Sequence, residues 1–175
     1  MLLETERLVI RSVEMTDEKA FVDMAADGSL AEDIGFDENC GSWMNNWIKE
    51  NKELDIQDDP RADSIAYTIE LKESGNVIGS VGCTYYDDMD KVGIVYFIGT
   101  KYRGSGYAAE AAKAYVDYFF EHYQEDELIA PIRDANEASC KTIEKVGFVL
   151  LEKKLYKDIN EEYEIMHRFY AVKRL

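Results

Sequence analysis

The segment KYRGSGYAAEA, which runs from Lys101 to Ala111, has the residue types of an anion-binding turn. Gly104 and Gly106 permit positive φ angles and let the backbone come close to a ligand. The alanines that follow predict a helix, whose first free N–H groups point toward whatever lies in front of them. Lys101 and Arg103 place two cationic side chains beside the turn. The sequence therefore predicts an anion site at a helix N-terminus.

Two common phosphate-binding motifs fit this segment poorly. A dinucleotide fingerprint needs a third glycine, where this chain has alanine and glutamate. A P-loop needs a glycine followed by lysine and then serine or threonine, which is absent. A turn that binds the pyrophosphate of an acyl-CoA is the third interpretation, and a turn whose glycines serve only geometry is the fourth.

The elements around the turn set its place in the fold. The apolar run 92–98 predicts a central strand, 108–123 predicts a helix with one apolar side, and 128–132 predicts a second strand. Strand, helix and strand at this spacing indicate a right-handed crossover between parallel strands. The glycine turn then lies at the carboxyl end of a central strand, where ligands bind in open sheets.

The remaining elements follow from capping and periodicity. Thr16 is expected to cap a helix that ends near Gly28, and Asn136 to cap one that ends at Gly147. Trp43 and Trp47 lie on the apolar side of a further helix, 42–54, where they form core or a lid over a substrate cleft. The expected strands are 6–13, 64–71 and 77–85, followed by a closing hairpin of 148–157 and 163–172 around Asp158 to Asn160.

Composition narrows the class of protein. A chain of 175 residues with 46% hydrophobic residues is large enough to form one domain with a real core. The formal net charge of −16 argues against nucleic-acid binding, which needs a basic face. It favours a cationic partner, or serves only to keep the chain soluble.

Cysteines and apolar segments indicate the compartment. The three cysteines are scattered singly and without metal-ligand spacing, which predicts free thiols in a reducing cytosol and no metal site. No apolar run approaches membrane-spanning length, and the first residues lack the apolar segment of a signal peptide. We expect a cytoplasmic chain that binds no membrane.

Three motifs carry a resemblance to a known family. The segment 103–108, RGSGYA, is similar to the Arg/Gln-x-x-Gly-x-Gly/Ala signature of the GNAT superfamily of N-acetyltransferases. The segments 136–139 (NEAS) and 144–148 (EKVGF) resemble its second motif, and 5–8 (TERL) resembles the ribosomal-protein alanine N-acetyltransferase (RimJ/RimL) subgroup. The match runs in order over nearly the whole chain.

This resemblance implies a fold and an activity. The expected fold is α/β, with a mixed, curved, mostly antiparallel sheet that has a central parallel pair and is flanked by helices, all in a single domain, 1–175. The expected activity is transfer of an acetyl group from acetyl-CoA to a primary amine by direct attack, without a metal. The acceptor would be a peptide or protein N-terminus or a small-molecule amine, and the chain a monomer or a homodimer.

The resemblance also implies site residues. Small residues in the glycine turn would let main-chain amides approach the CoA pyrophosphate, and the end of the central strand would pair with the pantetheine arm. A main-chain N–H near Phe97 would polarise the thioester carbonyl, which gives Phe97 a catalytic role. The implied cofactor-binding residues are Tyr96, Phe97, Ile98, Arg103, Gly104, Ser105, Gly106, Tyr107, Ala108 and Asn136.

The acid and the base are less well defined by the sequence. Ser139 either donates a proton to the departing thiolate or only occupies a first helical turn. Many family members have a tyrosine acid where this chain has Ile143, and some relatives have a glutamate where it has Gly93. The base is therefore unassigned, with candidates at the ends of the hairpin strands: Glu70, Asp87 and Asp88.

The missing base bears on the acceptor. Deprotonation at pH 7 costs about 4.6 kcal/mol for a lysine-like amine but only about 1.1 kcal/mol for an α-amino group. A site without a base favours the α-amino group, and a base acting through water would remove the preference. The alternative function is a non-catalytic acyl-CoA sensor or interaction module, because the usual tyrosine and glutamate are absent.

Overall fold

The computed structural model describes residues 1–159 and 161–174, with the backbone but not the side chains of residues 32 and 33. The strands are β1 (Leu2–Glu4), β2 (Leu8–Ser12), β3 (Ile65–Leu71), β4 (Val77–Tyr86), β5 (Lys91–Ile98), β6 (Glu127–Arg133), β7 (Val149–Tyr156) and β8 (Ile165–Lys173). The α-helices are α1 (Glu18–Ala25), α2 (Ala31–Ile34), α3 (Met44–Gln57), α4 (Tyr107–His122) and α5 (Glu137–Val146), and short 3₁₀ turns cover Met15–Asp17, Cys40–Ser42 and Thr100–Tyr102.

The described strands form one sheet in the order β1-β2-β3-β4-β5-β6-β8-β7. Every neighbouring pair is antiparallel except β5 and β6. The predicted mixed, mostly antiparallel sheet with a central parallel pair is therefore confirmed. The parallel pair has a single bridge, Gly93 to Ile129, so β5 and β6 separate toward their carboxyl ends.

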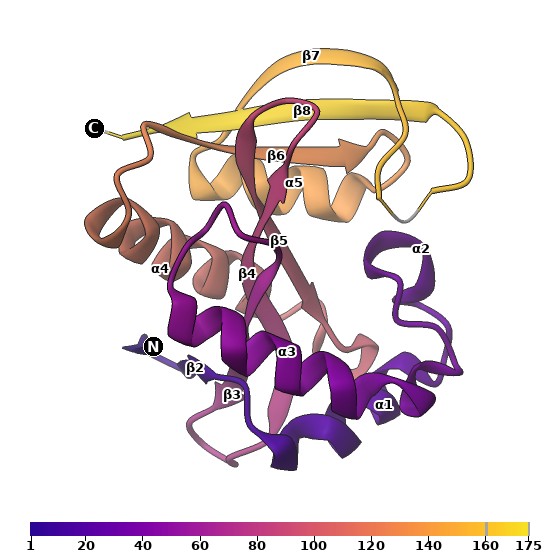
Figure 1. The fold of residues 1–175 in the computed structure, drawn as a ribbon, viewed down its shortest axis with the longest axis vertical. Helices are drawn as coiled ribbons and strands as arrows, with labels where there is room; N and C mark the ends of the chain where they lie inside the picture. Colours follow the sequence, from indigo (N-terminus) through magenta and orange to yellow (C-terminus); the bar gives the residue numbers. More distant parts are fainter. Residues whose placement is uncertain (160, 175) are drawn as a thin grey trace.

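Helices cover both faces of this sheet (Figure 1). On one face α4 and α5 pack through residues such as Tyr115, Phe119 and Ile143, which are fully buried. On the other face α1 and α3 pack through a second cluster that includes Phe21 and Ile48. The sheet thus separates two apolar clusters.

Most predicted elements are confirmed within two or three residues, and the caps of α5 are confirmed in detail. The Asn136 side chain accepts a hydrogen bond from the N–H of Ser139 at 3.1 Å, and Gly147 ends the helix with φ +110°. The prediction that Thr16 caps the first helix is wrong. A 3₁₀ turn precedes α1, and Glu14 and Asp17 cap it reciprocally.

The closing hairpin is confirmed as β7 and β8, but β8 lies between β6 and β7. Their connection is a loop from 157 to 164 (the β7–β8 loop), in which Asn160, predicted as part of the turn, lies outside the described residues. The loop lies at the same end of the sheet as the carboxyl end of β6, since Arg133 pairs with His167.

Candidate active site

The glycine turn has the geometry of an anion site. Gly104 and Gly106 have φ angles of +81° and +82°, and Gly106 directly precedes α4. The N-cap residue is Gly106, which has no side chain to cap the helix, so first-turn N–H groups of α4 are left for a ligand or solvent. A Cβ atom at Gly104 would have no neighbour within 4 Å. A pyrophosphate can therefore come close to the main chain at this turn.

An N-terminal clamp fixes the start of α4. The Glu110 carboxylate accepts hydrogen bonds from the Thr5 hydroxyl at 2.6 Å, the Arg7 N–H at 2.9 Å and Arg7 Nε at 2.7 Å. Burial raises the pKa of Glu110, but these hydrogen bonds outweigh it and hold the pKa below its ordinary value. Arg7 also donates to the Ser105 carbonyl at 2.9 Å. The segment 5–8 thus positions the glycine turn.

The basic residues of the turn have different surroundings. Arg103 Nε donates to the Ile98 carbonyl at 2.8 Å, which ties the turn to the end of β5. Lys101 lies over the Tyr102 ring, on the side away from the cleft described next. Arg103 is therefore the cation of this pair that reaches the cleft.

A cleft lies between the end of β5, the start of α4 and α5, and we call it the helix-side cleft. Its volume is about 350 Å³, which is within the range of small-molecule sites. Ser105 is the one predicted cofactor-binding residue outside its lining. The lining residues are Leu30, Ile34, Tyr96, Phe97, Ile98, Tyr102, Arg103, Gly104, Gly106, Tyr107, Ala108, Ala109, Asn136, Ala138, Ser139, Thr142 and Lys145.

The opening of the sheet exposes main-chain groups of β5. The N–H of Gly99 donates to Ile78 on β4 at 2.9 Å, and the register between β4 and β5 is unbroken. Successive N–H groups along a strand point alternately to its two neighbouring strands, so the N–H of Phe97 faces β4, while those of Tyr96 and Ile98 face β6. The main-chain donor at the end of β5 that faces the opening is therefore that of Ile98, next to Phe97.

Ser139 lies at the inner end of the helix-side cleft. Its N–H is held by Asn136, and its carbonyl accepts from the Tyr96 hydroxyl at 3.2 Å. Among the described residues its own hydroxyl has no hydrogen-bond partner. The main chain of Ser139 is therefore held in place, and its hydroxyl is able to donate.

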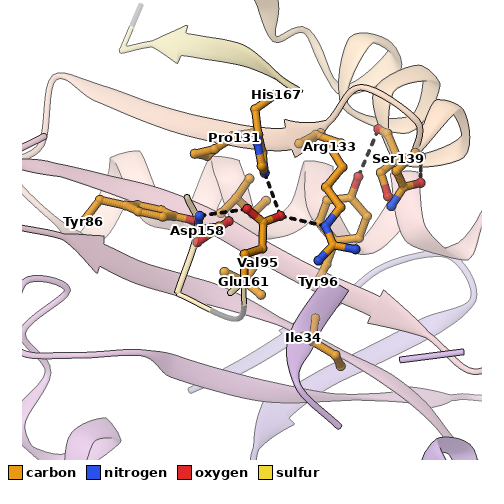
Figure 2. A pocket seen from close by; sticks show the side chains of 14 residues that line it. Ile34, Tyr86, Val95, Tyr96, Pro131, Arg133, Ser139, Asp158, Glu161 and His167 are labelled. Atoms are coloured by element: carbon orange, nitrogen blue, oxygen red, sulfur yellow. Dashed lines mark hydrogen bonds and ion pairs between the residues drawn. The ribbon is translucent and has the colours of Figure 1, made fainter. Parts of the chain in front are cut away.

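A second cavity adjoins this cleft, between β5, β6, β8 and the β7–β8 loop, and we call it the loop-side cavity (Figure 2). Its volume is about 90 Å³, and Ile34, Tyr96, Asn136 and Ser139 line both spaces. The sequence did not predict it, because its residues come from distant segments. Its other lining residues are Tyr86, Ile94, Val95, Ala130, Pro131, Ile132, Arg133, Asp158, Glu161 and His167.

Glu161 organises the loop-side cavity. Its side chain is 4% exposed and accepts from Arg133 Nε at 2.7 Å and from the Asp158 N–H at 3.0 Å. His167 Nε2 lies 3.2 Å from the same carboxylate, while His167 Nδ1 lies 3.1 Å from the Ile165 carbonyl. Figure 2 shows these contacts converging on Glu161. This buried carboxylate therefore joins the β7–β8 loop to β6 and β8.

The position of the family glutamate has no room for a side chain here. A Cβ atom at Gly93 would lie 2.5 Å from the Tyr86 ring and 3.2 Å from the Ile129 carbonyl. Tyr86 fills that space and lines the loop-side cavity. A base on β5 at this point would need the tyrosine to move.

The other sequence candidates do not line either cavity. Glu70 pairs with Arg11 at 3.1 Å on the far part of the sheet. Asp87 and Asp88 are exposed in the turn between β4 and β5. Ile143, which stands where many family members have a tyrosine acid, is fully buried in the core.

Trp43 and Trp47 pack at the edge of the second apolar cluster. They contact Phe36 with ring centroids 5.5 and 5.2 Å apart, and Phe36 lies 5.4 Å from Phe97. The predicted core role is therefore confirmed, and neither tryptophan lines the two cavities. The three cysteines are buried free thiols.

The described residues contain no cluster of three or more histidine, cysteine, aspartate or glutamate side chains placed to hold a metal. Within the same part of the chain, the helices are too short or too polar to cross a membrane.

A profile of the acetyltransferase (GNAT) domain matches residues 7–149, which is most of the chain. The chain belongs to the GNAT family of acetyltransferases. The predicted family and fold are confirmed, and so is the enzyme class, an acetyl-CoA-dependent acetyltransferase. The glycine turn of this GNAT chain lines the helix-side cleft and lets a pyrophosphate come close to the main chain, so its residues fit the phosphate end of an acyl-CoA.

Individual relatives agree with this assignment. An uncharacterised N-acetyltransferase of Bacillus subtilis, YjdG, is 25% identical over 162 residues, which cover 87% of this chain and 92% of the relative. A GNAT-family acetyltransferase from Bacillus anthracis has a TM-score of 0.82 at 23% identity, with 99% of this chain and 98% of that one covered. RimL, a ribosomal L7/L12 α-N-protein acetyltransferase solved with coenzyme A, has a TM-score of 0.82 at 13% identity, with 99% and 98% covered.

Proposed function

We propose that this chain transfers the acetyl group of acetyl-CoA to a primary amine, by direct attack of the amine nitrogen on the thioester carbon. The observation that carries the proposal is the shared wall of the two cavities, formed by Ile34, Tyr96, Asn136 and Ser139. A donor in the helix-side cleft and an amine in the loop-side cavity would meet at this wall. Proximity would then supply much of the rate without a covalent enzyme intermediate.

The glycine turn would hold the pyrophosphate of the donor. Gly104 and Gly106 permit the close approach, and the first-turn amides of α4 at Tyr107 and Ala108 supply N–H donors. Arg103 adds a cation at the turn, and Ser105 is held by Arg7. Lys145, which the sequence did not predict, adds a second cation from α5.

The exposed edge of β5 would bind the pantetheine arm and polarise the thioester. Tyr96, Phe97 and Ile98 line the cleft as expected. By the register of the sheet, the N–H of Ile98 faces the opening, so the oxyanion role passes from Phe97 to this neighbour. Phe97 would contribute its ring to the cleft wall.

Ser139 would protonate the leaving group. When the amine attacks, the bond between the carbonyl carbon and sulfur breaks, and the thiolate takes the hydroxyl proton of Ser139. The proton that the attacking nitrogen loses would pass through water to the Ser139 oxygen and restore the hydroxyl. The hydroxyl lacks a partner among the described residues, and Asn136 and Tyr96 fix the backbone on both sides of it.

The charge of the chain and of the loop-side cavity, rather than the relatives, indicates the class of acceptor. RimL acts on a ribosomal protein according to its title, but an identity of 13% shows the fold alone. The net charge of −16 and the carboxylate of Asp158 at the loop-side cavity favour a cationic amine.

Thiol release from acetyl-CoA with a panel of amines tests the proposal. We expect amine-dependent release, and Ser139→Ala should lower kcat on the order of 10²-fold while the Kd for acetyl-CoA stays near the wild-type value. Ser74→Ala, in the turn between β3 and β4, is the matched control and should change neither. Tight acetyl-CoA binding without amine-dependent release would instead favour a non-catalytic sensor.

A further inference from the structure

Asp158 stands out in the loop-side cavity as a carboxylate without a cationic partner. It lines the cavity and is half-buried. Its Oδ1 atom accepts a hydrogen bond from the Ile159 N–H at 2.6 Å. Among the described residues, no lysine, arginine or histidine forms an ion pair with it. The other carboxylate oxygen remains available to a ligand.

The basic side chains that line the cavity already have a carboxylate partner. Arg133 and His167 both face Glu161, at 2.7 and 3.2 Å. Glu161 in turn holds Asp158, because it accepts the Asp158 N–H while its own N–H donates to the Asp158 carbonyl at 3.0 Å. Asp158 is therefore fixed in place by a neighbour whose own charge is compensated.

Burial without a cation is unfavourable for a carboxylate. Desolvation raises the pKa of Asp158, and Glu161 adds to this effect, while His167 and Arg133 oppose it. The remaining charged or titratable groups near it are Tyr86 and Asp88 from β4 and its turn, and Tyr156 from β7. A cation that entered the cavity would find in Asp158 a partner that the protein itself leaves unpaired.

The geometry points to Asp158 as the group that binds the ammonium form of the acceptor amine and takes its proton. This inference rests on the proposed function. The N–H bond of the ammonium breaks and an O–H bond forms on Asp158, directly or through one water. The neutral amine then attacks, and its nitrogen loses a second proton through water to the Ser139 oxygen, which replaces the proton given to the thiolate. Asp158 releases the first proton to solvent after the product leaves.

Acid and base would lie on opposite sides of the cavity. In the view of Figure 2, Asp158 lies beside Tyr86, on the other side of Glu161 from Ser139 and Tyr96. The proton taken from the amine and the proton given to the thiolate would therefore move at separate places. The substrate class changes accordingly: with a base present, the site is suited to alkyl primary amines that are protonated at pH 7, such as a lysine side chain or a diamine.

The pH profile of kcat/KM for a lysine-like amine tests the inference. Wild-type enzyme should show a flat profile from about pH 7 to pH 9, because both the ionised Asp158 and the ammonium form persist over this range. Asp158→Asn can use only the neutral amine, so its kcat/KM should rise about tenfold per pH unit. At pH 7 the variant should be about 100-fold slower than wild type, with an unchanged Kd for acetyl-CoA.

Two further variants make the result specific. Glu162→Gln, an exposed carboxylate of the same loop, should keep the flat profile. Asp158→Glu keeps the carboxylate and should restore part of the rate at pH 7. A wild-type profile that itself rises tenfold per unit, parallel to that of Asp158→Asn, overturns the inference even if the variants fold poorly. In that case the proposed function stands, whereas a wild-type enzyme that releases no thiol with any amine contradicts both.

Discussion

Replacing Glu161 by glutamine should weaken the whole loop side of the site. The glutamate accepts charge-assisted hydrogen bonds from Arg133 and from the Asp158 N–H, and His167 lies at 3.2 Å, all with 4% of the side chain exposed. Hydrogen bonds to a charged group contribute about 1 kcal/mol more than neutral ones. Two such bonds and the lost histidine contact give a destabilisation of about 2 to 3 kcal/mol.

Thermal unfolding measures this loss. For a chain of this size each kcal/mol lowers the Tm by about 2 to 4 °C, so Glu161→Gln should lower it by about 5 to 10 °C. Because Glu161 does not line the helix-side cleft, the Kd for acetyl-CoA should stay unchanged while the KM for the amine rises. Glu162→Gln is the control and should leave the Tm in place. A Tm of Glu161→Gln within 1 °C of wild type would refute the reasoning.

Two other perturbations test the cofactor end and the core. Gly106→Trp should fill the helix-side cleft and weaken acetyl-CoA binding, measured by titration, by at least about 100-fold, or about 2.7 kcal/mol. Gly75→Trp is the control: Gly75 lies in a distant turn with a similar φ of +68°, so this variant should have the same backbone strain and retain binding. Asp17 is 2% exposed and accepts two hydrogen bonds from Arg11, each at 2.9 Å, so Asp17→Asn should cost about 3 kcal/mol in denaturant unfolding at pH 7. Burial raises the pKa of Asp17, but Arg11, Glu14 and Thr68 outweigh it and lower the pKa overall. The stabilisation by ionised Asp17 is therefore complete above about pH 4. The difference in free energy of unfolding between wild type and Asp17→Asn should narrow as the pH falls below that value. A difference that is constant with pH would contradict this role of Asp17.

Local signals made much of the fold predictable from the sequence. Gly106 and Gly147 are needed where the backbone takes positive φ at a helix end, and Asn136 supplies the oxygen that the first turn of α5 lacks. The apolar strand and helix around the glycine turn fix the parallel crossover. Such signals depend on a few neighbouring residues, so one chain suffices to recognise them.

The N-terminal clamp was only partly predictable. The segment 5–8 was recognised as a motif, but its contact with Glu110 joins residues more than 100 positions apart. Thr16 was a reasonable cap by type, and lost that role because Glu14 and Asp17 close the 3₁₀ turn instead. Propensity cannot decide between adjacent capping residues when tertiary contacts, here Arg11 with Asp17, select one.

The loop-side cavity was not predictable from spacing. Tyr86, Arg133, Glu161 and His167 come from β4, β6, a loop and β8, and only the insertion of β8 between β6 and β7 brings them together. Lys145 is different, since Ser139, Thr142 and Lys145 recur every three residues along α5 and share one face. That periodicity would have added Lys145 and Thr142 to the cleft.

A calorimetric titration of the purified protein with acetyl-CoA tests the central claim most directly, with ATP and NAD as controls at the same ionic strength. We predict saturable one-to-one binding of acetyl-CoA, with neither control nucleotide binding comparably, because the glycine turn of residues 103–108 and the end of β5 line one cleft that would hold the pyrophosphate and the pantetheine arm together. No binding of acetyl-CoA by protein shown to be folded would contradict it, and the two glycines would then serve only the turn that starts α4.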